Sequence, residues 1–270
     1  MRRAVAAAGT LFVALAVAIA CGEVPTLPGG VAYITPVLLP SPSVAFGDTL
    51  RDSLGRAAPL RVYAIGRDSA DTIRTLARRF VLTSLNTGAL LGNDGILVAP
   101  DSLVSLRIVA QVTDGSGATA LQLQTPEITL DVVPRADSIA STPVARDTAR
   151  VLAPLTPLPV TVTGVGPRNV RGAVGGIRVR YRIAAVYFPT GIARGRYYLA
   201  DDANNVLRPD STLALDTTSS AGAASRAFVA PAIADGAAVA DSVLVEASAL
   251  SQRGVPLHGS PVRFVIRVRR

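Results

Sequence analysis

The sequence predicts an all-β protein, built as two consecutive β-sandwich domains behind an N-terminal leader. From residue 31 onwards, short segments alternate between apolar and polar residues, and Gly, Pro, Asn and Asp separate these segments. No sustained helical periodicity appears after the first 20 residues. Removing these 20 residues from the 270 leaves 250, which is enough for two domains of ordinary size.

Residues 1–20 are expected to form a signal-peptide helix. Arg2 and Arg3 stand before an almost unbroken apolar run, and small residues follow that run. A run this short, with basic residues in front and small residues behind, is typical of an export signal rather than of a membrane span. No second apolar run reaches spanning length.

The end of the leader resembles the bacterial lipobox. Ala18-Ile19-Ala20 precedes the only cysteine, Cys21, although Leu is usual at the place of Ala18. The resemblance implies cleavage before Cys21 and lipidation of its thiol, which would anchor the chain to a membrane. Gly22 stands where lipoproteins kept in the inner membrane often carry Asp, so the resemblance further implies a cell-envelope location in the outer membrane. An ordinary signal peptide that ends near a cysteine is the alternative.

Residues 21–30 follow as a flexible tether, since they contain two prolines, two adjacent glycines and a single charged residue. The first domain is expected over residues 31–134. Its predicted strands cover residues 59–66, 79–85, 103–112 and 127–133. Asn93-Asp94-Gly95 lies between two apolar runs and predicts a tight hairpin turn. The only helical candidate in this half is the short segment 71–79.

Residues 135–145 are polar and contain a proline, and we expect the linker between the domains there. The second domain is expected over residues 146–270. Its predicted strands cover residues 158–165, 177–183, 241–248 and 262–268. The alternation is cleanest over residues 177–183, where the apolar set would face a core and the arginines would face solvent.

Several turn and strand motifs resemble bacterial Ig-like modules. The segment 216–225, followed by Ser242–Ala247, is similar to a loop and a "V-x-V-x-A" strand of invasin-type Ig-like domains. Gly259–Phe264 is similar to their "G-x-P-V-x-F" strand. The resemblance implies two tandem Ig-like β-sandwiches and brings no catalytic residue with it. Within the loop, we expect Gly222 at a positive-φ position and Asp216 to cap the turn through backbone amides.

The composition argues against several classes of chemistry. All 27 basic residues are Arg and the net charge is +8, but an exported chain meets no chromosomal DNA, so nucleic-acid binding is not expected. One cysteine excludes an internal disulfide, and the absence of Lys excludes a Walker loop. His258 is the only histidine and is expected in a surface loop, which leaves no clustered His or Cys ligands for a metal. The cluster 201–205 lacks the Gly and Glu of a calcium loop. We expect neither an enzyme nor a bound cofactor or metal.

One surface feature could contact a partner. Arg178, Arg180 and Arg182 alternate along one strand, and Arg267 and Arg269 follow the same pattern near the C-terminus. Charged residues on a solvent face commonly give solubility and protect sheet edges. The functional alternative is contact with an anionic glycan or lipid phosphate, because Arg binds such groups bidentately.

Together these features predict a non-enzymatic, lipid-anchored protein of the cell envelope. Its role would be structural, adhesive or protein-binding, with an envelope protein or an anionic glycan as the partner. The alternative is a periplasm-facing accessory lipoprotein of an envelope transport or assembly complex.

Overall fold

The computed structural model describes residues 31–66, 73–74, 77–114, 121–142, 148–150, 156–188, 197–200, 211–230, 240 and 242–269. These residues form an all-β protein with several sheets, and the only helical element among them is a 3-10 turn at Pro167–Asn169. No helix in the described part of the chain is both long and apolar enough to cross a membrane. The predicted signal peptide, Cys21 and the tether lie outside the described residues.

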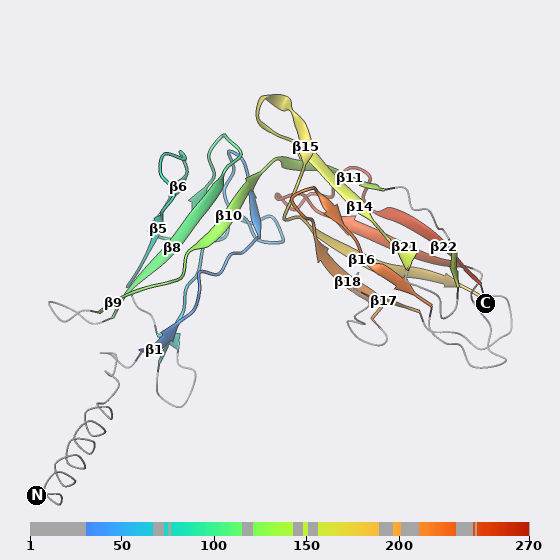
Figure 1. Ribbon diagram of the computed structural model, residues 1–270, viewed down its shortest axis with the longest axis horizontal. Coiled ribbons are helices and arrows are strands. Elements are labelled where there is room, and N and C mark those ends of the chain that lie inside the picture. The colour runs from blue at the N-terminus through green and yellow to red at the C-terminus, as the bar shows by residue number, and fades with distance from the viewer. Residues whose placement is uncertain are drawn as a thin grey trace, which may run out of the picture.

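The buried apolar side chains form two clusters that divide the chain near its middle. One cluster draws on residues from 37 to 132, and the other on residues from 133 to 268. We refer to residues 31–134 as the first half and to residues 135–269 as the second half. Figure 1 shows the two halves side by side, with the chain passing from β10 into β11 between them.

The first half packs around a sheet with the order β2-β10-β8-β5, and β9 adds to β8. These strands are β2 (Ser43–Ala45), β10 (Ile128–Val133), β8 (Ser105–Asp114), β5 (Ala77–Leu82) and β9 (Leu121–Gln124). A second sheet contains β1 (Val31–Ile34), β3 (Ala64–Gly66) and β4 (Ile73–Arg74), and β6 (Leu90–Leu91) pairs with β7 (Leu97–Val98). The strands predicted over residues 103–112 and 127–133 are confirmed as β8 and β10.

The helical candidate at residues 71–79 is not a helix where the structure describes it, because this stretch contains β4 and the start of β5. β5 pairs antiparallel with β8, and Phe80 is buried while Arg78 and Arg79 are exposed. Sheet pairing thus satisfies the backbone groups that a helix would have used. The tight turn at residues 93–95 is confirmed, since it joins β6 to β7 and Gly95 has a φ of 82°.

The second half is a two-layered β structure around one core. Its larger sheet has the order β12-β22-β21-β16-β18, and the facing sheets have the orders β11-β14-β15, with β19 on β14, and β13-β20-β17. The larger sheet contains β12 (Thr148–Arg150), β22 (Val262–Arg269), β21 (Ser242–Ala249), β16 (Arg178–Tyr187) and β18 (Leu213–Thr217). The facing strands are β11 (Arg135–Ser141), β14 (Val160–Val165), β15 (Arg171–Ala173), β19 (Ala223–Ala224), β13 (Thr156–Pro157), β20 (Ala227–Val229) and β17 (Tyr198–Ala200). In Figure 1, β11 and β14 lie across β16, β21 and β22.

The expected linker over residues 135–145 differs from the structure, because Arg135–Ser141 forms strand β11 and pairs with β14. Only Pro134 separates this strand from β10. The polar residues of β11 that suggested a linker have partners on the sheet surface. Asp137 accepts hydrogen bonds from Arg171, and Ser138 bonds to Thr163. The strand still contributes Ala136 and Ile139 to the core.

The loop at residues 216–225 has the predicted backbone chemistry. Gly222 has a φ of 73°. The Asp216 carboxylate accepts hydrogen bonds from the amides of Thr217 and Ser225, each at 2.8 Å. Arg226 also contacts Asp216 at 3.1 Å. The cap and the positive-φ glycine are therefore confirmed.

Candidate functional site

The five arginines of the predicted anion-binding stripe lie on the outer face of the larger sheet. Arg178, Arg180 and Arg182 are exposed on β16, and Arg267 and Arg269 are exposed on β22. The alternate residues of both strands point into the core, as the alternation predicts. The stripe is thus a real feature of the solvent-facing side of the sheet.

The structure places the two groups of arginines towards opposite ends of that face. Tyr181 is paired with Ala247, which is paired with Val262, so these three residues mark one level of the sheet. Arg180 lies just before this level and Arg267 lies well beyond it. At the usual rise along a strand, they are about 20 Å apart. One small ligand group therefore cannot contact both.

Arg182 forms an ion pair with an acid on the neighbouring strand. Its guanidinium donates to the Glu246 carboxylate at 2.8 Å, and Arg263 donates to the other oxygen of Glu246 at 3.3 Å. The hydrogen bond from Arg182, helped by Arg263, holds the pKa of Glu246 below its ordinary value. Arg182 is therefore less available to an anionic ligand than its position in the stripe suggested.

Arg178 and Arg180 differ from Arg182 in this respect. Within the described part of the chain, neither side chain has an ion pair with a carboxylate. Leu215 of β18 lies opposite Arg180 on one side, and Ser248 of β21 lies opposite it on the other. No carboxylate of the described residues therefore pairs with either guanidinium group at this end of the sheet.

A cavity of about 440 Å³ lies next to these two arginines, at the junction of the halves. The first half provides one wall and the second half provides the other. The first wall contains Pro40, Ser41, Asp52 and Ser53; the second contains residues 176–178, Arg180, Leu215 and residues 248–252.

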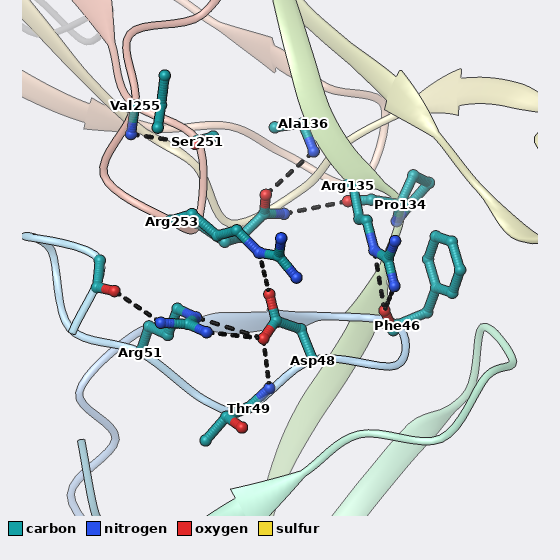
Figure 2. A network of polar contacts seen from close by, with 12 residues as sticks. Phe46, Asp48, Thr49, Arg51, Pro134, Arg135, Ala136, Ser251, Arg253 and Val255 are labelled. Atoms are coloured by element: carbon teal, nitrogen blue, oxygen red, sulfur yellow. Dashed lines mark hydrogen bonds and ion pairs between the residues drawn. The ribbon is translucent and has the colours of Figure 1, made fainter. Parts of the chain in front are cut away.

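A buried carboxylate holds the junction together beside this cavity (Figure 2). Asp48, on a turn of the first half, accepts a hydrogen bond from Nε of Arg253 in the second half at 2.7 Å. Arg51 and the amide of Thr49 donate to the other oxygen at 3.0 and 2.8 Å. Burial raises the pKa of Asp48, but the hydrogen bonds from Arg253, Arg51 and Thr49 outweigh it and leave the pKa below its ordinary value.

Further side-chain contacts hold the segment at residues 134–136, where the chain passes from the first half to the second. Gln252 donates to the carbonyl of Pro134 and accepts from the amide of Ala136, both at 3.0 Å. The Arg135 guanidinium lies 4.6 Å from the centre of the Phe46 ring and also bonds to the Phe46 carbonyl (Figure 2). Cation–π contact and hydrogen bonding thus act at the same crossover.

No family model matches the chain, and no curated protein matches it. Among solved structures, the chain is similar to one described as "Crystal structure of the S-layer protein SbsC domains 4 and 5". The identity is 10%, the TM-score is 0.24, and the match covers 88% of this chain and 96% of that chain. The site is therefore derived from its own residues.

The remaining candidates contribute no site. His258 is exposed and lies next to β11, where its backbone bonds to Asp137 and Ile139, as expected for a surface loop. Among the described residues, no group of three or more His, Cys, Asp or Glu side chains could hold a metal ion. The cluster 201–205 lies outside the described residues.

The sequence did not indicate the residues that define the junction. Asp48 and Arg253 are 205 positions apart, and no local pattern connects them. Glu246 could have been found, because the alternation of residues 241–248 places it on the same outer face as the arginines. Its exact neighbours depend on the order of the strands, which the alternation does not contain.

Proposed function

We propose that this chain is a non-enzymatic, lipid-anchored protein of the cell envelope, in which two tandem Ig-like β-sandwiches present a surface to an envelope protein or an anionic glycan. The observation that carries the proposal is the pairing of two separately cored β halves through a tight, hydrogen-bonded crossover. Such an arrangement gives a stiff two-module body, suited to holding a binding face away from a membrane.

The N-terminal sequence supports the anchoring part of the proposal. Cys21 follows an apolar leader whose end resembles a lipobox, and several acyl chains on one residue hold a protein firmly at a membrane. The Ig-like part is supported by the two-layered second half and by the Asp216 and Gly222 loop chemistry. The adhesive or protein-binding role rests on fold-level analogy.

Metabolic labelling with a clickable fatty acid tests the anchor. The wild-type chain should take up the label and fractionate with membranes, and Cys21→Ser should lose both properties. A matched Ser41→Cys substitution in the Cys21→Ser background should not restore labelling, because its cysteine lies outside the lipobox. A wild-type chain that remains unlabelled and is freely released would overturn the proposal.

Protease treatment of intact cells tests which side of the envelope the body faces. A protein that presents its surface outside the cell should be digested, whereas a periplasm-facing accessory protein should survive until the outer membrane is opened. Cross-linking in whole cells, followed by recovery of the tagged chain, then identifies the partner.

A further inference from the structure

We propose that the cavity between the halves is a binding site for an anionic sugar, in which Arg178 and Arg180 hold the oxyanion. This inference rests on the proposed function, and it specifies the class of ligand and the residues that recognise it. A binding test on the purified chain remains independent of the labelling and protease tests above, so either set can fail without the other.

The size and shape of the cavity suit a small ligand. Its volume of about 440 Å³ lies within the range of roughly 300–1,000 Å³ that is usual for small-molecule sites. Its walls come from both halves, and such inter-unit clefts are preferred places for ligands. Gln252 lines the cavity and also donates to the Pro134 carbonyl at the crossover, so a hydrogen bond between the halves lies at the cavity wall.

Two arginines and one carboxylate, Asp52, line the cavity, so its net charge favours an anion. Arg178 and Arg180 come from the same face of β16, two positions apart, and their side chains have no carboxylate partner among the described residues. Two residues on one strand face are about 7 Å apart, which allows both guanidinium groups to reach one carboxylate or phosphate. Arg182 is excluded from this role, because Glu246 already binds it.

The rest of the lining suits the hydroxyl groups of a sugar ring. Ser41, Ser53, Ser248 and Ser251 line the cavity. The Ser248 hydroxyl also donates to the Arg180 carbonyl, and the Ser251 hydroxyl accepts from the Val255 amide. Asp52 also lines it and caps its own turn, with one oxygen accepting from the amides of Leu54 and Arg56 at 2.9 Å. As an acceptor, this carboxylate favours a hydroxyl donor over a second anionic group, which indicates a ligand with one oxyanion and several hydroxyls.

Titration calorimetry of the full-length protein, purified in detergent at low salt, tests the proposal with three probes. Galacturonate carries one carboxylate, glucose 6-phosphate carries one phosphate, and galactose is the neutral control. We expect saturable binding of at least one anionic probe and none of galactose. The two anionic arms distinguish a carboxylate ligand from a phosphate ligand.

Variants separate the cavity from general surface charge. Arg178→Ser with Arg180→Ser should weaken binding by about tenfold or more, because charge-assisted bonds to the ligand are lost. Arg267→Ser with Arg269→Ser removes the same charge from the far end of the sheet and should leave binding unchanged. Ser53→Trp fills the cavity from the opposite wall without changing charge, and it should also abolish binding.

Thermal unfolding of each variant establishes that it is folded, which is expected because all the substituted side chains are exposed. No saturable binding of either anionic probe by the wild-type protein would overturn the proposal. So would equal losses from the two double-arginine variants, since those losses would reflect net charge alone.

Discussion

The Asp48 carboxylate and the Arg253 guanidinium meet across the junction of the two halves, with Nε of Arg253 2.7 Å from Oδ2 of Asp48. The Asp48 side chain is only 7% exposed, and Arg51 and the Thr49 amide occupy its other oxygen. A buried carboxylate is tolerated when its oxygens are matched in this way, and removing its charge leaves the cations uncompensated. Asp48 is therefore one of the residues that join the two halves, and it is the most deeply buried charge at their junction.

Asp48→Asn should lower the free energy of unfolding by about 1–3 kcal/mol, because the amide has a single acceptor oxygen and no charge, so its NH2 group must face a donor on one side. Urea denaturation followed by circular dichroism measures this change. Glu127→Gln is the matched control, since its ion pair with Arg107 is exposed and spans 3.6 Å. The control substitution should lower the free energy of unfolding by less than about 1 kcal/mol. Equal costs for the two substitutions would contradict the assignment.

The contribution of Asp48 should disappear in acid. The bonds from Arg253, Arg51 and Thr49 outweigh burial and depress the pKa of this carboxyl. A depressed carboxyl pKa stabilises the fold at pH values above the unfolded pKa of about 3.9, and this stabilisation is lost as the pH falls from there through the folded pKa. The difference in stability between wild type and Asp48→Asn should thus be constant from about pH 5 to 7 and shrink below about pH 4.

Urea midpoints measured across this pH range provide the test. Asp137 and Glu246 also have depressed pKa values, but they are present in both proteins and cancel in the difference. A difference that persists unchanged to about pH 2 would show that the Asp48 charge contributes nothing.

Gln252 should stabilise the crossover through two main-chain groups. Its amide bonds to the carbonyl of Pro134 and to the N–H of Ala136, and both of these residues are buried. Gln252→Ala leaves the two backbone groups without that partner, so it should cost about 1–3 kcal/mol. Gln124→Ala, on the exposed side of β9, should change the free energy of unfolding by less than about 0.5 kcal/mol. Chemical denaturation of both variants compares them, and a Gln252→Ala cost as small as the control would refute the role.

Local patterns predicted most of the strands, because the period-two alternation reports which face is buried. The strand predicted over residues 59–66 is an exception, since only Ala64–Gly66 forms a strand. In β22, Phe264, Ile266 and Val268 are buried while Arg267 and Arg269 are exposed, as the sequence indicates. The turn chemistry was equally local, as at Asp216 and Gly222. These features depend on residues within a few positions of one another.

The sequence predictions failed where the structure depends on contacts between residues that are far apart in the chain. Residues 135–141 are polar, and only their pairing with β14 and the ion pair from Arg171 to Asp137 make them a strand. The sequence left open whether Arg267 and Arg269 join the stripe of Arg178, Arg180 and Arg182. Strand order separates Arg267 from Arg180 and brings Glu246 to Arg182. Local patterns could not predict the cavity at the junction either, because its walls come from both halves of the chain.

Alanine substitutions at three glycines separate the energetic effect of a left-handed backbone from that of a steric clash. Gly222 has a φ of 73°, and an added Cβ would lie 2.5 Å from the Val162 carbonyl oxygen. Gly88 has a φ of 72°, but the nearest atom to its added Cβ is 3.7 Å away on Pro100. Gly172 has neither problem, with its nearest neighbour at 4.0 Å. The three positions therefore form a graded series.

Gly88→Ala should lower the free energy of unfolding by about 1 kcal/mol, because alanine disfavours the left-handed backbone conformation at this position. Gly222→Ala should cost about 3 kcal/mol or more, because the clash with Val162 forces β14 away from the loop that Asp216 caps. Gly172→Ala should be neutral or slightly stabilising, since alanine restricts the unfolded chain. Urea unfolding of the three variants gives the order directly. If Gly222→Ala costs no more than Gly88→Ala, the close approach of the 216–225 loop to β14 is not maintained in solution.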